Sequence, residues 1–360
     1  MGFLAGWISV TVGFAAPIAL GAMAFGTYFS SALSLGEEGW PRVLSIGVVL
    51  GVVAIHLRPI RLGANFQSVF TGLKVLFILI LIAACFVNGG GEKVTFLPRE
   101  GDIALLLSPE FAIALVFVMY AYTGWNAATY IVDEVRDPQR TVPRALVVGS
   151  ILVTLLYMGL NGGFLYSAPM AMMAGEMEVA KVAADHVMGP TGGRVMAGLI
   201  CFGLVSMLSA SVWVGPRVAQ RMGEDFHQLR LLARKSSSGI PMNAILLQTA
   251  IVVILILTSS FETVLVYIEL LLVLFALVTV AGVFWSRIHH SGLSRPLKAW
   301  GYPLTPLFFI GVNAWMMVYL VKIRPMEALW GLSTLLVGVG VYFLARQGSK
   351  ESRPAVGQGN

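Results

Sequence analysis

The residues best suited to chemistry lie in one stretch, 119–144, which reads MYAYTGWNAATYIVDEVRDPQRTVPR. It begins inside an apolar run, which the polar, glycine-containing segment 123–126 interrupts. An unwound turn in a membrane helix leaves backbone carbonyls free to receive an ammonium group. The stretch therefore indicates a binding site for a small amine-bearing molecule, and the alternative is a packing glycine flanked by core aromatic side chains. The aromatic and amide side chains at the interruption are Tyr120, Tyr122, Trp125, Asn126 and Tyr130.

A short charged segment follows the interruption and precedes the next apolar run. Its three acids and three arginines are Asp133, Glu134, Arg136, Asp137, Arg140 and Arg144. Alternating signs of this kind suit a cytoplasmic ion-pair network that opens during transport. An ordinary solvated turn is the alternative.

Lys74 lies about one and a half turns inside a predicted membrane helix. Its ammonium either reaches back to the interface or lies inside the bundle, where it would replace a coupling cation. The serines at 206, 209 and 211 recur near helical spacing in a later apolar run, where packing is their default role. Ser209 is a weaker candidate for a partner of Lys74.

Glu269 is the one acid that the predicted spans place well inside an apolar helix. A carboxylate within a bilayer is costly, so it indicates a functional site or a hidden partner. A proton carrier and a structural hydrogen-bonding group both stay open.

The composition is that of a membrane protein. The chain has 57% hydrophobic and 12% charged residues and a mean hydropathy of +0.83, whereas a soluble globular protein has about 25% charged residues. A spanning helix needs roughly 20 apolar residues, and ten stretches qualify: 3–34, 41–57, 65–87, 110–132, 144–167, 194–214, 241–258, 261–286, 302–323 and 325–345. We therefore predict an all-α, polytopic transmembrane helical bundle, with one transporter domain at 1–346 and a disordered cytoplasmic tail at 347–360.

The distribution of basic residues predicts the orientation. Placing Met1 in the cytoplasm puts most of the 24 Lys and Arg residues on that side. Both termini are then cytoplasmic, and the chain is a multi-pass protein of the cell membrane. Met1-Gly2-Phe3 leads into an apolar stretch without a basic region, so we expect no cleaved signal peptide.

The composition also excludes several classes of function. No basic patch or soluble module supports binding to nucleic acid, and neither a metal site nor a cofactor is indicated. A membrane enzyme would need His and acids clustered in one span, but the histidines lie at the end of an apolar run (His56) or outside the runs: His186, His227, His289 and His290. Cys85 and Cys201 are expected to be buried small hydrophobes.

Small residues and prolines predict local features. The glycine- and alanine-rich first span should be central in the bundle, with a kink at Pro17. Segment 167–191 should lie over the bundle with a helical middle, and Gly215-Pro216-Arg217 should break the helix. The last two spans are chemically quiet, which is typical of scaffold or of a dimer surface, so a homodimer stays open.

The stretch 120–126, followed by Glu134, Arg140 and Arg144, resembles the sixth helix and following loop of the amino acid-polyamine-organocation (APC) transporters. Its Gly-Trp-Asn triplet is similar to that of the L-type amino acid transporter branch. Lys74 matches that family's fifth-helix lysine, and the stretch from Gly215 resembles the turn after helix eight, with Arg217 as its arginine.

The resemblance implies the LeuT-like inverted-repeat fold working by alternating access. In that family the broken sixth helix supplies carbonyls for the substrate ammonium, here those of Tyr120, Ala121 and Thr123, next to Gly124 and Trp125. Tyr120 matches a gate over the substrate, and Asn126 matches a residue that lines the pocket. Lys74 corresponds to the lysine that bridges helices one and eight in place of sodium.

One departure from the family pattern concerns the start of the chain. The family has twelve helices, and its first carries a glycine-rich turn that holds the substrate carboxylate. The expectation is that about ten of the twelve are present and that helices one and two are absent.

The function expected from the resemblance is secondary active transport of amino acids, neutral ones first, by a permease or an exchanger rather than an enzyme. The alternatives are an inactive or regulatory remnant of such a transporter, and an antiporter of polyamines or cationic amino acids. Sodium coupling is disfavoured by Lys74, Glu269 allows proton symport, and the L-type resemblance suggests exchange.

Overall fold

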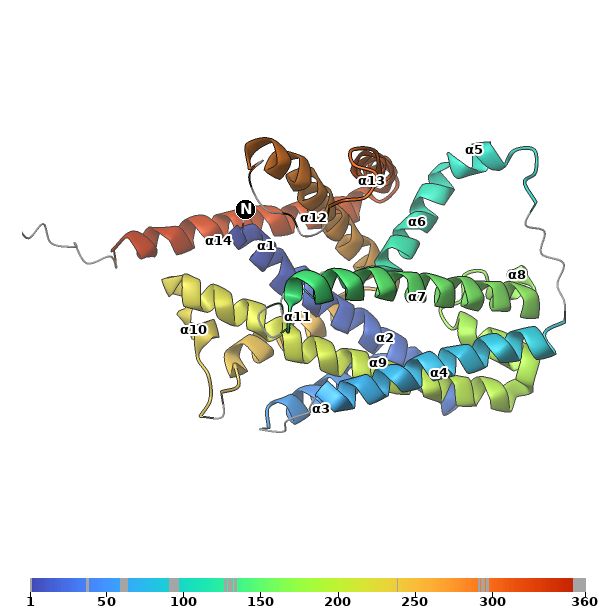
Figure 1. Cartoon of the computed structure of the whole chain (residues 1–360). Helices are drawn as coiled ribbons and strands as arrows, with labels where there is room; N and C mark the ends of the chain where they lie inside the picture. Colours follow the sequence, from blue (N-terminus) through green and yellow to red (C-terminus); the bar gives the residue numbers. More distant parts are fainter. Residues whose placement is uncertain are drawn as a thin grey trace, which may run out of the picture.

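The computed structural model describes residues 2–36, 39–58, 64–90, 97–125, 128, 132, 135–237, 239–290, 292, 295 and 298–351, without the side chains at 64–67 and 346–351. Within these residues the chain forms helices and no strand (Figure 1). The first half contains α1 (Gly2–Ile8), the π-helical turn η1 (Ser9–Phe14), α2 (Ala15–Ala32), α3 (Trp40–His56), α4 (Ala64–Asn88), α5 (Asp102–Leu106), α6 (Pro109–Ala121) and α7 (Pro138–Ser167). The second half contains α8 (Met170–Met173), α9 (Val179–Asp225), η3 (His227–Leu229), α10 (Arg230–Ala233), α11 (Met242–Thr258), α12 (Phe261–His289), α13 (Leu304–Ile323) and α14 (Pro325–Glu351).

The predicted membrane spans are confirmed as helices. In the described residues, seven helices are long and apolar enough to cross a membrane, and α3, α6 and α11 are shorter apolar helices. Each of the ten stretches predicted from hydropathy overlaps one of these helices, although α6 covers only the first part of 110–132 and α9 extends beyond 194–214 at both ends. The chain is a polytopic helical membrane protein.

The first span lies at the centre of the bundle, as predicted. Its second part, α2, packs against α9, α3, α11 and α12. The side chains of Ala15, Ala16, Ala19 and Ala22 are fully buried, because small residues let neighbouring backbones approach closely in lipid. The irregularity expected at Pro17 takes the form of η1, which ends just before this proline. Proline has no N–H for the helical ladder, and a π-helical turn is one way in which the ladder rearranges.

The predicted helix break at Gly215-Pro216-Arg217 is wrong. Helix α9 continues through Pro216 to Asp225, and its non-helical residue is Gly189, with φ 72°. Gly215 is held between Phe14 and Gln248, since a Cβ added to it would overlap the side chains of both. The neighbouring helices therefore keep the chain helical around a proline whose missing donor would otherwise favour a break.

The end of the chain continues as helix further than expected. Helix α14 runs to Glu351 and so enters the segment 347–360, which the sequence predicts as a disordered tail. Residues 352–360 lie outside the described part of the chain.

Cys85 and Cys201 are both buried, as predicted.

The predicted segment 167–191 is helical in α8 and in the start of α9 up to the non-helical Gly189, and it contacts the end of α2. The Tyr28 hydroxyl donates a hydrogen bond to the Met177 carbonyl at 3.3 Å. Burial raises the pKa of the Glu178 carboxyl above its ordinary value, and the Ser31 hydroxyl and the Lys181 ammonium partly offset this rise. Lys181 Nζ also lies 2.9 Å from Asp185 Oδ2.

Helix ends predicted to share one side of the membrane lie together. Arg324, between α13 and α14, forms an ion pair with Glu262 at the start of α12. At the other end of the bundle, the centroid of the Phe3 ring lies 4.8 Å from that of the Phe226 ring and 5.4 Å from that of the Tyr342 ring. The start of α1, the end of α9 and the later part of α14 therefore meet, as the alternating topology requires.

Gly26 gives a direct test of the close approach between α2 and α3. A Cβ at this position would overlap the Pro41 carbonyl oxygen and Ser45 Oγ, whereas a Cβ at Gly47 of α3 would meet nothing within 4 Å. We expect Gly26→Ala to lower the free energy of unfolding by about 1–3 kcal/mol through overpacking. The matched control Gly47→Ala should raise stability by up to about 1 kcal/mol through helix propensity. Thermal unfolding of the purified protein in detergent measures both, and equal shifts would contradict the packing.

Candidate functional site

The predicted interruption of the fourth membrane stretch is confirmed as the end of α6. This helix begins with Pro109 after the Ser108 hydroxyl, which accepts a hydrogen bond from the Phe111 N–H at 3.2 Å. It ends at Ala121, although the apolar run continues to 132. Gly124 then has φ +92°, a conformation that favours glycine. The sequence-predicted glycine thus lies in the turn that ends the helix.

The backbone of this turn, 120–124, is held by side chains. The Tyr120 carbonyl accepts hydrogen bonds from the Thr123 N–H at 3.0 Å and from Thr123 Oγ1 at 2.7 Å. The Ala121 carbonyl accepts one from the Tyr157 hydroxyl of α7 at 2.9 Å. The rings of Tyr122 and Tyr157 also meet edge to face, with centroids 5.2 Å apart.

These hydrogen bonds limit what the turn can still bind. A carbonyl oxygen has two acceptor positions. The Tyr120 carbonyl already receives two donors from one residue, while the Ala121 carbonyl receives the single Tyr157 hydroxyl. The Ala121 carbonyl is therefore the better placed of the two to accept a further donor, such as a substrate ammonium.

The side chains of the predicted site differ in their surroundings. Tyr120 is half-buried and packs against the largest cluster of buried residues. In the described part of the chain Thr123 and Gly124 are exposed, and the Trp125 side chain is 52% exposed. Asn126 lies outside the described residues, so its role as a pocket-lining amide stays a prediction.

Glu269 of α12 is brought to the same region as Tyr120. Its side chain is 1% exposed, and its carboxylate is close enough to interact electrostatically with the Tyr120 hydroxyl. Its Oε2 atom has no hydrogen-bond partner among the described residues. The sequence identified both residues, but nothing in their spacing predicted that they lie close together.

Lys74 reaches α9, the helix that carries the candidate serines. Its Cγ and Cδ atoms lie 3.7 and 3.8 Å from the position that a Cβ on Gly203 would take. The weaker candidate partner, Ser209, is instead hydrogen-bonded to His56 Nε2 of α3 at 2.9 Å. The sequence does not predict this pair, because the two residues belong to separate helices and His56 lies at the end of its apolar run.

The residues of the predicted loop network occupy separate surroundings. Arg140 Nε lies 3.9 Å from Asp137 Oδ2, and both side chains are exposed, so the pair contributes little to stability. Arg144 is exposed on α7, and the Arg217 guanidinium lies 3.7 Å from the centroid of the Trp213 ring. Glu134 lies outside the described residues, and the network stays a prediction.

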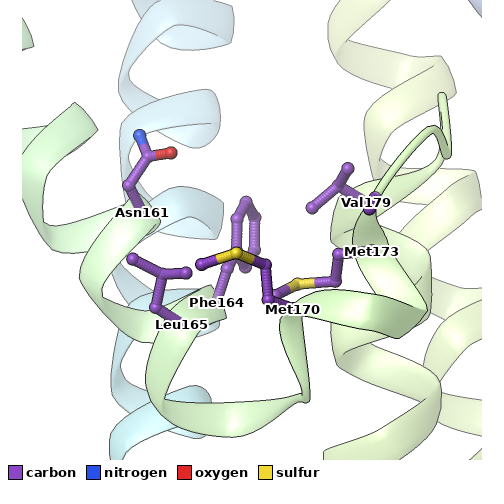
Figure 2. A pocket seen from close by; sticks show the side chains of 7 residues that line it. Asn161, Phe164, Leu165, Met170, Met173 and Val179 are labelled. Carbon is purple, nitrogen blue, oxygen red and sulfur yellow. The ribbon is translucent and has the colours of Figure 1, made fainter. Parts of the chain in front are cut away.

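Two hollows lie elsewhere in the structure. Figure 2 shows the first, a cavity of about 210 Å³ lined by Asn161, Phe164, Leu165, Met170, Met173, Ala174 and Val179, where α7, α8 and the start of α9 meet. The Asn161 amide there donates to the Tyr157 carbonyl at 2.8 Å. The second, of about 380 Å³, lies between α2, α3 and the start of α12 and includes Arg42 and Met177. Neither is lined by a predicted substrate-binding residue.

Comparison with known proteins gives a match along nearly the whole chain. The family described as amino acid permease matches residues 1–342. The chain belongs to the amino acid permease family. Its relatives include b(0,+)-type amino acid transporter 1 of Mus musculus, 26% identical over 352 residues, which are 95% of this chain and 71% of that protein. Another is large neutral amino acids transporter small subunit 2 of Homo sapiens, 25% identical over 352 residues, 95% of this chain and 65% of that protein.

These matches confirm the predicted resemblance to the APC transporters and to their L-type branch. They support amino acid transport by a multi-pass membrane protein. The matched family and relatives are transporters and not enzymes. In the part of the chain that the structure describes, no group of three or more His, Cys, Asp or Glu side chains could hold a metal ion.

The Tyr157 hydroxyl offers a test of how the end of α6 is held. Tyr157→Phe removes the donor to the Ala121 carbonyl, and one hydrogen bond contributes about 0.5–1.5 kcal/mol. We therefore expect the amides of 119–125 to exchange with solvent deuterium faster, by up to about tenfold. Tyr166→Phe on the same helix, whose ring packs on Phe86 at 5.5 Å, is the control. Unchanged exchange in Tyr157→Phe would mean that the turn does not depend on α7.

Proposed function

We propose that this chain transports neutral amino acids across the cell membrane by alternating access, with the end of α6 as its ammonium-binding element. The observation that carries the proposal is the termination of α6 at Ala121 inside an apolar run, with Gly124 at φ +92°. Irregular backbone at membrane depth is tolerated where it lines a binding cavity. Membership of the amino acid permease family supplies the substrate class.

Neutral substrates fit the chemistry of this turn better than cationic ones. The turn offers carbonyl oxygens and, in the sequence, the amide of Asn126, and segment 119–126 contains no acid that would pair with a second positive charge. The human relative is named for large neutral amino acids. Polyamines and cationic amino acids are therefore the lesser alternative.

The remaining roles are assigned to residues around the turn. Tyr120 acts as the gate over the substrate, since it carries one carbonyl of the turn and packs against the buried core. Lys74 supplies an ammonium between α4 and α9 in place of a sodium ion. The charged residues from Glu134 to Arg144, with Arg217, form a cytoplasmic network that opens as the LeuT-like halves rock. Both termini lie in the cytoplasm, and the membrane is the plasma membrane.

Uptake into vesicles tests the proposal. The full reading frame that contains this chain would be reconstituted and supplied with a panel of radiolabelled amino acids from outside. We expect saturable uptake or exchange, strongest for neutral amino acids with bulky side chains. Absence of saturable uptake and of exchange across the panel would overturn the proposal and favour an inactive or regulatory remnant.

Lys74→Ala tests the role of this ammonium, whose side chain is half-buried. Without it the two helices lose a fixed positive charge, and we expect transport to fall at least about tenfold, equivalent to roughly 1.4 kcal/mol in the transport barrier. Lys322→Ala is the control, because Lys322 lies over the Tyr319 ring at the end of α13, 5.9 Å from its centroid. Uptake would be divided by the amount of protein in the membrane. If uptake and abundance fell equally, Lys74 would be merely structural.

A further inference from the structure

Glu269 is a buried carboxyl group on a helix segment that belongs to the apolar core. Its neighbours along α12, Ile268 and Leu271, are fully buried, and they belong to the cluster that also contains Val12 of η1 and Met316 of α13. Moving a carboxylate from water to such surroundings costs several kcal/mol unless a cation or hydrogen-bond donors compensate for the lost water.

No cation compensates for this charge among the described residues. The elements packed against α12 include η1, α2, α6, α13 and α14, and residues 9–32 contain no Lys, Arg, Asp or Glu. On α13 and α14, Lys322 lies over the Tyr319 ring and Glu327 lies 4.0 Å from Arg324. On α12 itself, Glu262 pairs with Arg324, Arg287 lies over the Tyr302 ring, and His289 stacks on Trp285.

One described group that interacts electrostatically with Glu269 is a phenol on α6, a helix that packs against α12. This phenol is the side chain of Tyr120, and Oε2 of Glu269 has no hydrogen-bond partner in the described part of the chain. The other tyrosine nearby in sequence, Tyr267, is engaged with Thr334 Oγ1 at 2.8 Å. A neutral, protonated carboxyl group is therefore the stable form of Glu269 in this conformation.

We infer that Glu269 binds a proton that is carried across the membrane together with the amino acid, so that the transporter is a proton symporter. This inference rests on the proposed function and names its coupling ion. The proton comes from water on the outer side, forms an O–H bond with the carboxylate, and is released to water on the inner side when the site opens there. No other bond forms or breaks.

Tyr120 connects this proton site to the substrate site. Its carbonyl lies in the turn, and its hydroxyl interacts electrostatically with Glu269. A movement of this residue when the amino acid binds or leaves changes the access of water to the carboxyl group. Protonation and substrate occupancy are then linked through one side chain.

Gradient-driven uptake tests the inference in proteoliposomes. A labelled neutral amino acid would be supplied with and without an inward proton gradient to the wild type, Glu269→Gln and Glu327→Gln. Glu327 is the matched control because it is 9% exposed but has Arg324 as a partner. We expect the gradient to drive accumulation in the wild type and in Glu327→Gln. Glu269→Gln should exchange amino acids but accumulate none above equilibrium.

Three results separate the inference from the proposed function. Gradient-driven accumulation by Glu269→Gln would overturn the inference. Wild-type uptake that does not change with the proton gradient would also overturn it. Both results would still show amino acid transport. A wild type that transports nothing fails the proposed function. Glu269→Asp, which keeps the carboxyl group, should keep gradient-driven accumulation and so distinguishes lost proton binding from misfolding.

Infrared spectroscopy gives a readout that does not depend on transport. At neutral pH the wild type should show the carbonyl stretch of a protonated carboxylic acid, and this band should be missing in Glu269→Gln and present in Glu327→Gln. Identical spectra for the wild type and Glu269→Gln would overturn the inference.

Discussion

In the hydrocarbon core of a bilayer, every backbone N–H and C=O needs a partner within the protein. The end of α6 meets this constraint through two side chains, since Thr123 returns to the Tyr120 carbonyl and Tyr157 of α7 reaches the Ala121 carbonyl. A helix end within the hydrocarbon core needs donors from its own turn or from another helix, and here it has both. The candidate substrate site therefore depends on the packing of α6 near α7 as much as on its own residues.

The small residues of α2 make the rest of the arrangement possible. Because Ala15, Ala16, Ala19 and Ala22 occupy little space, α3, α9, α11 and α12 all reach this central helix (Figure 1). Helix α9 can then lie beside α4, where the stem of Lys74 passes over Gly203. Helix α12 packs against α2 and α6, where Glu269 interacts electrostatically with Tyr120. The small apolar residues of α2 thus position polar groups that lie far apart in the sequence.

The sequence predicted the apolar helices that a lipid bilayer requires. It did not predict the contacts that depend on which helices lie side by side. Hydropathy identified the apolar helices of the described residues, since a membrane helix must be long and apolar. The glycine-containing interruption located the end of α6. The hydrogen bonds from Tyr157 to Ala121 and from Ser209 to His56 were not predictable, because they join separate helices. Pro216 suggested a break that the contacts of Gly215 with Phe14 and Gln248 prevent.

The central claim is that an amino acid binds at the end of α6, and crosslinking tests it most directly. A photoreactive amino acid with free ammonium and carboxylate groups would be bound to the full-length protein and activated, and the labelled peptides would be mapped by mass spectrometry. The account predicts labelling of 120–126 that unlabelled neutral amino acid prevents. Binding at the end of α6 would be contradicted if the labelling that unlabelled amino acid prevents were confined to the hollow between Asn161 and Val179 or to the hollow that contains Arg42.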